Sequence, residues 1–462
     1  MRKFLANYSA AAHLALLAVA PLFLFPFCGA ATVATVLFWL SLIAALWVVM
    51  SPSCRSGEQP HNARARLTLE VLRDPLMWLL LLAVLYSAVR MINGGVALCY
   101  DAEAMEWSIK SPGVENLPSC VDGEGVLPFA ATVALFVLIV GVRHALGQNA
   151  STAFLAASTV FAGISAIVTA IALSYGSVGA MDMVDCSYNA PSFVGTAYGV
   201  YLIVGVAALF GCIENGWRII EPFVALGLVC SAVGLELFSP SATFIVFALA
   251  FIVFLIVAFP LSKGVFVGSA SFRCALVSLM VIAAVVLVAL FCDNYDPFVA
   301  KRDALLAMKP FPEGFAATRE ALSSIALKSW RQSPWLGAGV GSFPLDLRFF
   351  ASPEDWLLIS PRQTAVPSSW WQILVERGIL GALLLVVGTA FLAWTYFAAV
   401  VKSVGGGKWR PACLVGPIVA APLVAVSFID CSLLRPDVLL PTAAALAVSA
   451  VVFTRDSRTQ DL

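Results

Sequence analysis

Charged residues are scarce in this sequence: only 12% of the 462 residues are Asp, Glu, Lys or Arg, and 61% are hydrophobic. Soluble globular domains carry roughly 25% charged residues, so the composition excludes that class. Lys and Arg balance Asp and Glu at 27 each. A chain without net charge has no overall positive field to attract nucleic acid, and we expect no nucleic-acid partner. The composition predicts a polytopic membrane protein.

Histidine is nearly absent, with His13, His61 and His144 as its three occurrences. The 11 cysteines form no Cys-x-x-Cys pair and no Cys/His cluster with metal-ligand spacing. We therefore expect no metal site and no cofactor. Cys99 and Cys120 fall in a polar stretch that we expect outside the cytoplasm. A disulfide between them is compatible with an oxidising compartment, and the sequence leaves that pairing open.

Long apolar runs make up most of the chain. A transmembrane helix needs about 20 mostly apolar residues, and runs of this kind recur from end to end. The first expected span starts at Ala11, and the others lie near residues 31–50, 75–93, 126–142, 153–174, 193–212, 219–238, 242–260, 274–292, 378–401, 411–430 and 438–454. The sequence thus predicts an all-α membrane protein with about twelve transmembrane helices.

The distribution of Lys and Arg predicts the orientation, because cytoplasmic loops are enriched in these residues. With a cytoplasmic N-terminus, the short outer loops hold little beyond Arg90, Lys110 and Arg435. The inner loops and tail then hold Arg55, Arg64, Arg66, Arg73, Arg143, Arg218, Lys263, Arg273, Lys402, Lys408, Arg410, Arg455 and Arg458. Both termini are therefore expected in the cytoplasm.

One long polar interruption separates the ninth and tenth expected spans and is predicted to face outward. It divides the chain into residues 1–292, 293–377 and 378–462, with three spans in the last part. Helices are expected over residues 297–307 and 316–331. The apolar stripe of the second predicts that it lies along the outer leaflet. The interruption holds nine of the 27 Lys and Arg residues: Lys301, Arg302, Lys309, Arg319, Lys328, Arg331, Arg348, Arg362 and Arg377.

These residues suit phosphate binding, because guanidinium groups pair with phosphate oxygens through two hydrogen bonds. Gly337, Gly339 and Gly341 would let the backbone turn tightly and approach a ligand. Their spacing differs from the nucleotide-phosphate fingerprint, which also needs a preceding strand. The pattern therefore favours a phosphate group on a lipid-borne substrate over a nucleotide.

Three elements of this region resemble the O-antigen ligase and O-antigen polymerase family. They are Arg319, the turn PWLGAGVGSF at residues 334–343 with Trp330 before it, and WQILVERGILG at residues 371–381. The motifs cover residues 315–381, and the expected topology resembles the family over the whole chain. The resemblance implies a bacterial inner-membrane glycosyltransferase with a periplasmic loop. It would transfer an oligosaccharide or polysaccharide from undecaprenyl pyrophosphate to an acceptor hydroxyl, as in lipopolysaccharide or exopolysaccharide biosynthesis.

The implied partners are this lipid-linked donor, a lipid or glycan acceptor, and membrane lipid. Arg319 matches the loop arginine of the family and is the first candidate to neutralise the leaving pyrophosphate. The expected substrate-binding residues are Arg331, Arg348, Arg362, Gly337, Gly339, Gly341 and Glu376.

The chain departs from the family at two places. A histidine is expected near Pro367 and Ser368 but is missing, and the usual Ser-Arg pair is replaced by SPSAT at residues 239–243. A carboxylate can substitute as the base that deprotonates the acceptor hydroxyl. Glu236 is the first candidate, because a carboxylate near the bilayer is costly unless it is used or paired. The other carboxylates considered are Asp346, Glu354, Asp355 and Glu376.

Three interpretations stay open. The first is a ligase or polymerase, which share a donor and differ in acceptor. The second is a non-catalytic relative that binds or presents a lipid-linked saccharide, which the two departures motivate. The third is a secondary transporter, which is disfavoured because no chain of ionisable residues crosses the expected spans.

Overall fold

We analysed the chain as a computed structural model. The structure describes residues 2–459 except for 51–59, 102–105, 111–112, 115–116, 147, 175–192, 262–276, 279, 283–313, 360–364 and 404–410. The expected helix at 297–307 and Arg362 therefore lie outside the described residues.

Within the described residues, eight helices are long and apolar enough to cross a membrane. They are α2 (Ala30–Met50), α4 (Pro75–Ile92), α5 (Val126–Val140) with its π-helical continuation η1 (Gly141–Ala145), α6 (Gln148–Ser174), α8 (Phe193–Glu214), α9 (Glu221–Phe238), α10 (Ser241–Leu261) and α15 (Ser369–Ser403). The fold is that of a helical polytopic membrane protein, as the composition predicts.

Three further apolar helices pack in the same bundle: α1 (Arg2–Leu24), α16 (Val415–Ser427) and α17 (Pro436–Thr459). Together these eleven helices coincide with eleven of the expected spans. The expected span at 274–292 lies almost wholly outside the described residues. The total of twelve therefore stays a prediction.

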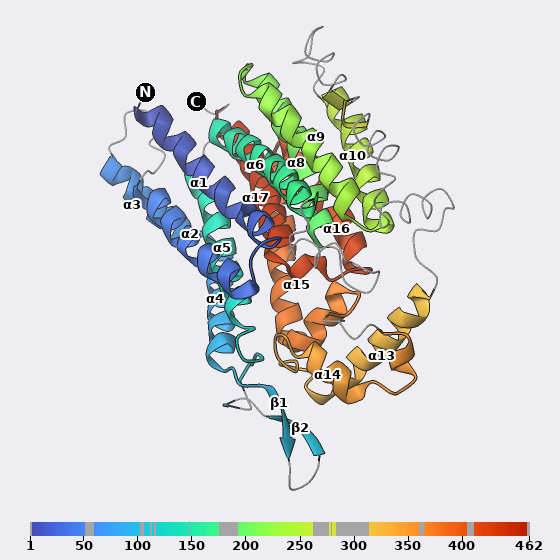
Figure 1. The fold of residues 1–462 in the computed structure, drawn as a ribbon. Helices are drawn as coiled ribbons and strands as arrows, with labels where there is room; N and C mark the ends of the chain where they lie inside the picture. The colour runs from blue at the N-terminus through green and yellow to red at the C-terminus, as the bar shows by residue number, and fades with distance from the viewer. Residues whose placement is uncertain are drawn as a thin grey trace.

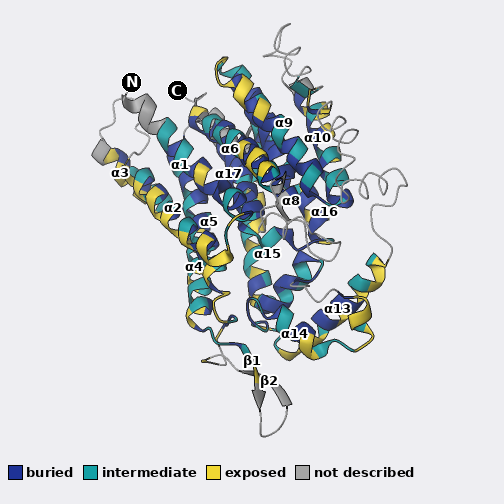
Figure 2. Cartoon of the chain, in the orientation of Figure 1, coloured by how far each residue is buried: buried dark blue, intermediate teal, exposed yellow. Residues whose placement is uncertain are grey.

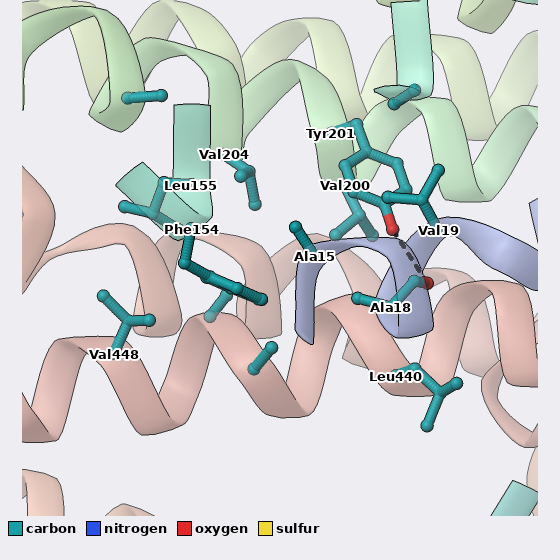
Figure 3. Close-up of a cluster of buried hydrophobic side chains, with 14 of the residues drawn as sticks. Ala15, Ala18, Val19, Phe154, Leu155, Val200, Tyr201, Val204, Leu440 and Val448 are labelled. Carbon is teal, nitrogen blue, oxygen red and sulfur yellow. Dashed lines mark hydrogen bonds between the residues drawn. The ribbon is translucent and has the colours of Figure 1, made fainter. Parts of the chain in front are cut away.

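Helix α8 forms the centre of the bundle: 94% of its apolar segment is buried, against 11% for α15. Figure 3 shows α8 side chains packed between α1, α6 and α17, where Tyr201 donates its hydroxyl to Ala18 O at 3.0 Å. Small residues allow close helix contacts in a membrane. A Cβ on Gly163 of α6 would lie 2.5 Å from Gly227 Cα of α9, so these two backbones touch.

The bundle has two distinct ends (Figure 1). The start of α1 and the end of α17 lie at one end. The hairpin of β1 (Ala97–Asp101) and β2 (Glu106–Lys110) lies at the other end with α13 (Phe315–Gln332) and α14 (Phe343–Phe350). This agrees with the expectation that both termini share one side and that the polar segment after α10 lies on the opposite side. Which end faces the cytoplasm stays a prediction.

Two elements differ from the sequence-based expectations. Strands β1 and β2 pair antiparallel, with Cys99 opposite Ser108, in a stretch expected as an irregular acidic loop. Cys99 and Cys120 are free thiols, so the disulfide is not formed. The polar connection after α2 contains a helix, α3 (Pro60–Arg73), which we expected as a loop because its arginines interrupt the apolar pattern.

The described part of the long polar segment forms a small helical unit. It consists of α13 (Phe315–Gln332), α14 (Phe343–Phe350) and η2 (Asp355–Leu357), so the helix predicted at 316–331 is confirmed. The expectation that its apolar face lies on the outer leaflet is wrong. Leu322, Ile325 and Ala326 are buried in a cluster with residues of α14 and the start of α15. The apolar stripe of α13 is therefore covered by protein side chains instead of lipid. Figure 2 shows one buried and one exposed face on α13.

Candidate functional site

Residues 334–341 lie against residues 375–380 of α15, a contact that we call the glycine clamp. Backbone hydrogen bonds join the two segments in both directions. The bonds run from Ala338 N to Val375 O (2.7 Å), Gly339 N to Glu376 O (3.2 Å), Ile379 N to Pro334 O (2.9 Å) and Leu380 N to Trp335 O (3.2 Å). The clamp therefore fixes the small helical unit to the first turns of a membrane helix.

The clamp depends on a break in α15 at Gly378, where φ is 63° and ψ is −168°. A side chain is strained at this φ. A Cβ on Gly378 would also overlap the backbone of Trp335 and Gly337, and a Cβ on Gly337 would lie 2.5 Å from Glu376 C. Glycine at both positions lets the two backbones meet directly, which explains why the two motifs occur together.

A buried arginine from a distant helix completes the clamp. Arg90, near the end of α4, is only 3% exposed. Its Nη1 donates to Glu376 O at 2.9 Å and its Nη2 to Leu336 O at 2.7 Å. The hydroxyl of Tyr86 donates to Arg377 O at 3.1 Å. From the sequence, Arg90 was expected in a short outer loop and had no assigned role. A lone arginine at the end of an apolar run was the available signal.

Glu376 is buried within this clamp and holds the glycine turn. Its Oε1 accepts hydrogen bonds from Gly341 N at 3.0 Å and from Gln372 Nε2 at 2.6 Å. The Oε1 of Gln372 in turn accepts from Val366 N at 2.8 Å. These bonds give Glu376 a positioning role, and its expected contact with substrate stays a prediction.

The five amides of residues 337–341 in the glycine turn all donate to protein oxygens. The donor–acceptor pairs are Gly337 N to Ser333 O, Ala338 N to Val375 O, Gly339 N to Glu376 O, Val340 N to Ser119 O and Gly341 N to Glu376 Oε1. A phosphate cradle needs several backbone N–H groups directed at the anion. The geometry therefore assigns Gly337, Gly339 and Gly341 to backbone packing, while their expected contact with substrate stays a prediction.

The expected arginines occupy different positions. Arg331 and Arg348 are exposed, whereas Arg319 is partly buried. Arg319 and Arg331 are twelve residues apart on α13, which separates their Cα atoms by about 18 Å along the helix axis. The three guanidinium groups are thus not gathered at one point by α13 and α14. Binding of substrate by Arg331, Arg348 and Arg362 stays a prediction.

Arg319 is the expected arginine that reaches the membrane bundle. Its Nη2 donates to Phe428 O at 2.6 Å. Phe428 begins the outer turn, which we define as residues 428–435 between α16 and α17 and which includes η4 (Ser432–Leu434). Among the described residues, no second protein acceptor contacts the Arg319 guanidinium. Most of its five N–H groups are therefore available to an anion.

The start of α15 also packs on the outer turn. Ser369 donates from both its N (3.0 Å) and its Oγ (2.8 Å) to Asp430 O. Trp370 Nε1 donates to Ser427 Oγ at 2.9 Å, and Ser368 Oγ to Ser427 O at 3.4 Å. The position where the family histidine was expected therefore lies beside this turn. Arg319 and the N-terminus of α15 meet at the same short segment of chain.

Asp430 is the buried carboxylate of the outer turn, 6% exposed. Its Oδ1 accepts a hydrogen bond from Cys431 N at 2.7 Å. Its Oδ2 is buried and accepts no hydrogen bond from the described residues. Burial raises the pKa of Asp430 from 3.8 to about 7, against the weaker lowering effects of the Cys431 amide and the Arg435 charge. Asp430 ends the expected span at 411–430 and was not one of the carboxylates considered as the base.

Glu236, the expected base, is 3% exposed and lies two residues before the end of α9. Helix α9 packs mainly against α6 and α8. The expected catalytic role of Glu236 stays a prediction.

A second buried carboxylate, Asp346 of α14, allows the packing of α13 on α14 to be tested through the pH dependence of stability. Its Oδ2 accepts from Ser329 Oγ at 2.8 Å and from Ser342 Oγ at 3.1 Å, so it joins α13 to α14. Burial raises its pKa from 3.8 to about 6, although both serine bonds lower it. A raised pKa means that the folded state favours the protonated form. This contribution to stability is full below about pH 4 and is lost as the pH rises through about 6.

We expect Asp346→Asn to remove the loss of folding stability that the wild type shows as the pH rises. The difference between 3.8 and about 6 corresponds to roughly 3 kcal/mol, so the midpoint temperature of the wild type should fall between pH 4 and 7 more than that of the variant. Thermal unfolding of both proteins in the same detergent, followed by tryptophan fluorescence, measures this. Equal pH dependence in the two proteins would show that Asp346 ionises freely in the folded state.

Comparison with known families and proteins gives one positive result. The family model described as O-Antigen ligase matches residues 226–386, and this confirms the resemblance seen in the motifs. The matched part includes Glu236, α13, the glycine clamp and the first half of α15, and it ends before the outer turn. No curated protein matches the chain.

Proposed function

From the premise that residues 226–386 carry the O-antigen ligase pattern, we propose that this chain is a membrane glycosyltransferase of the O-antigen ligase or polymerase type. It transfers an oligosaccharide or polysaccharide from undecaprenyl pyrophosphate to a hydroxyl of a lipid or glycan acceptor. The reaction takes place at the bundle end that carries α13, which we assign to the periplasmic face of a bacterial inner membrane.

The position of Arg319 is the observation that carries this proposal. Among the residues that the structure describes, its guanidinium makes one hydrogen bond, to Phe428 O. A neutral backbone carbonyl is a weaker partner for a guanidinium than a phosphate oxygen, because the phosphate carries negative charge and can accept two parallel N–H bonds. The diphosphate of a lipid-linked donor can therefore bind the remaining N–H groups without loss of a salt bridge.

The chemistry requires stabilisation of the leaving group. As the bond between the sugar carbon and the pyrophosphate oxygen breaks, negative charge grows on that oxygen. A fixed guanidinium near the outer turn lowers the energy of this charge in the transition state more than in the ground state, which is the condition for catalysis. Arg319 is suited to this role because a planar guanidinium can donate two parallel hydrogen bonds to a phosphate group.

The glycine clamp contributes by holding α13 in place. Arg319 lies on α13, and the end of α13 continues directly into residues 334–341, which are fixed to α15 by backbone hydrogen bonds. The clamp thus restrains the distance between Arg319 and the outer turn. A guanidinium held in this way has less conformational freedom to lose when the donor binds.

Turnover by the purified full-length protein tests the proposal. The protein in lipid nanodiscs is incubated with the lipid-linked glycan fraction from a strain of the source bacterium that lacks the gene. Mass spectrometry then follows release of undecaprenyl pyrophosphate and formation of a glycan-bearing acceptor lipid. We expect release that depends on the protein, and an Arg218→Ala variant, altered at the opposite end of the bundle, serves as the matched control.

Two outcomes would contradict the proposal in different ways. Binding of the donor without release of undecaprenyl pyrophosphate would favour a non-catalytic protein that presents a lipid-linked saccharide. Neither binding nor release would exclude a role with this class of lipid.

A further inference from the structure

The outer turn contains an acceptor oxygen that the fold does not use. Asp430 Oδ2 is buried and receives no hydrogen bond from the described residues. Burying a carboxylate oxygen without a donor costs several kcal/mol by transfer measurements, and native structures rarely keep such a group without a reason. A hydroxyl donor from outside the protein would satisfy it.

The other polar groups nearby are already committed. Arg435 pairs with Asp437, with Nε 3.1 Å from Oδ1 and Nη2 3.2 Å from Oδ2. Arg90 donates to two backbone carbonyls of the glycine clamp. Among the described residues, no cation donates a hydrogen bond to Asp430 Oδ2, although the Arg435 charge lowers the pKa of Asp430 and the Asp437 charge raises it.

Asp430 also lies close in the chain to the carbonyl contacted by Arg319, the arginine to which we assign the donor. Arg319 contacts Phe428 O, and Asp430 follows Phe428 by two residues, a span of at most about 7 Å of extended chain. The Asp430 carbonyl is fixed by two hydrogen bonds from Ser369. The position of its carboxylate relative to α15 is therefore restrained by the fold.

We propose that Asp430 is the catalytic base of the glycan transfer, accepting the proton of the acceptor hydroxyl on Oδ2. This inference rests on the proposed function. The acceptor oxygen forms a bond to the anomeric carbon of the sugar, while the bond from that carbon to the pyrophosphate oxygen breaks. The electron pair of the broken bond leaves with undecaprenyl pyrophosphate near Arg319. The acceptor proton passes to Asp430 and is then released to water, so the reaction yields one proton.

The protonation behaviour of Asp430 fits this role. Burial raises its pKa to about 7, and a general base is most effective when its pKa lies near the working pH. Among the described residues, the charged or titratable groups around the turn are Arg319, Arg435, Asp437, Cys431 and Glu376. Of these, Arg435 lowers and Asp437 raises the pKa of Asp430, and both effects are smaller than that of burial.

Asp430→Asn tests the inference, because the amide keeps the size and the bond to Cys431 N but cannot accept a proton. We expect turnover to fall about 100-fold or more, in the range typical of removing a general base, with binding of undecaprenyl pyrophosphate unchanged. The wild-type rate should rise with pH and level off above about 7, and the residual rate of the variant should lose this dependence. Ser432→Ala is the matched control in the same turn. The Ser432 hydroxyl is buried and has no hydrogen-bond partner among the described residues, so this variant should keep the wild-type rate and pH dependence.

Turnover of Asp430→Asn within threefold of wild type, with the same pH profile, would overturn the assignment. If this variant does not fold, Asp430→Glu provides the test. A shift in the pH at which the transfer rate is half-maximal, relative to wild type, supports the inference, and an unchanged pH overturns it. Wild-type protein without turnover at any pH would refute the proposed function itself, which is a different result from a turning-over enzyme that ignores Asp430.

Discussion

Replacing Arg319 with alanine should reduce glycan transfer about 100- to 1,000-fold, which is the usual cost of removing one group that stabilises developing negative charge. The large effect is expected because the variant loses a guanidinium that makes one hydrogen bond among the described residues, and with it the N–H groups that we propose bind the donor. Surface glycan from cells carrying the variant, separated by gel electrophoresis, gives the first readout. Release of undecaprenyl pyrophosphate by the purified variant gives the second.

Arg319→Lys separates charge from geometry. Lysine keeps the positive charge but cannot form the paired bonds of a guanidinium with a phosphate group, so we expect an intermediate loss. The fold should survive both substitutions, because Arg319 is only partly buried and is not part of the buried cluster of α13. Normal glycan from a normally expressed Arg319→Ala protein would contradict the assignment of Arg319 to the pyrophosphate.

Replacing Gly378 with alanine should have the largest effect on stability. The added methyl group meets the backbone of Trp335 and Gly337, and overpacking of this kind costs about 1–3 kcal/mol. The φ of 63° adds about 1–2 kcal/mol for a residue with a side chain. The clamp is expected to separate, with a lower midpoint of thermal unfolding and a large loss of transfer activity.

Gly388→Ala provides a matched control on the same helix. A Cβ on Gly388 meets no atom within 4 Å, and alanine is favoured over glycine in a helix by about 1 kcal/mol. We therefore expect unchanged or slightly higher stability. Comparable stability of the Gly378→Ala and Gly388→Ala proteins would show that the break in α15 is not needed for the fold.

The sequence determined the class of the protein and the position of most helices. Apolar runs of membrane length require backbone hydrogen bonds inside the segment, so each run forms a helix wherever the others lie. Residues 316–331 were likewise identified as a helix from local pattern alone. The glycine turn and the start of α15 were linked to each other through the family resemblance of their motifs.

The same reasoning could not assign the glycines a mechanical role. Gly337 and Gly378 are 41 positions apart, and their direct backbone contact depends on how residues 343–374 return the chain to the clamp. Arg90 belongs to α4, more than 240 positions before the carbonyls that it holds. Sequence pattern reports periodicity over a few turns, and it contains no information on which distant segments meet.

The sequence therefore decided the membrane fold and the family resemblance, which makes Arg319 the first candidate to contact the pyrophosphate. The tertiary structure decided that the glycine turn packs on α15, that Glu376 and Arg90 hold it there, and that Asp430 lies beside Phe428 with an unused oxygen. The physical reason is that hydrophobicity and backbone geometry are properties of local segments. Burial, pKa and hydrogen-bond partners arise only when segments remote in the chain are brought together.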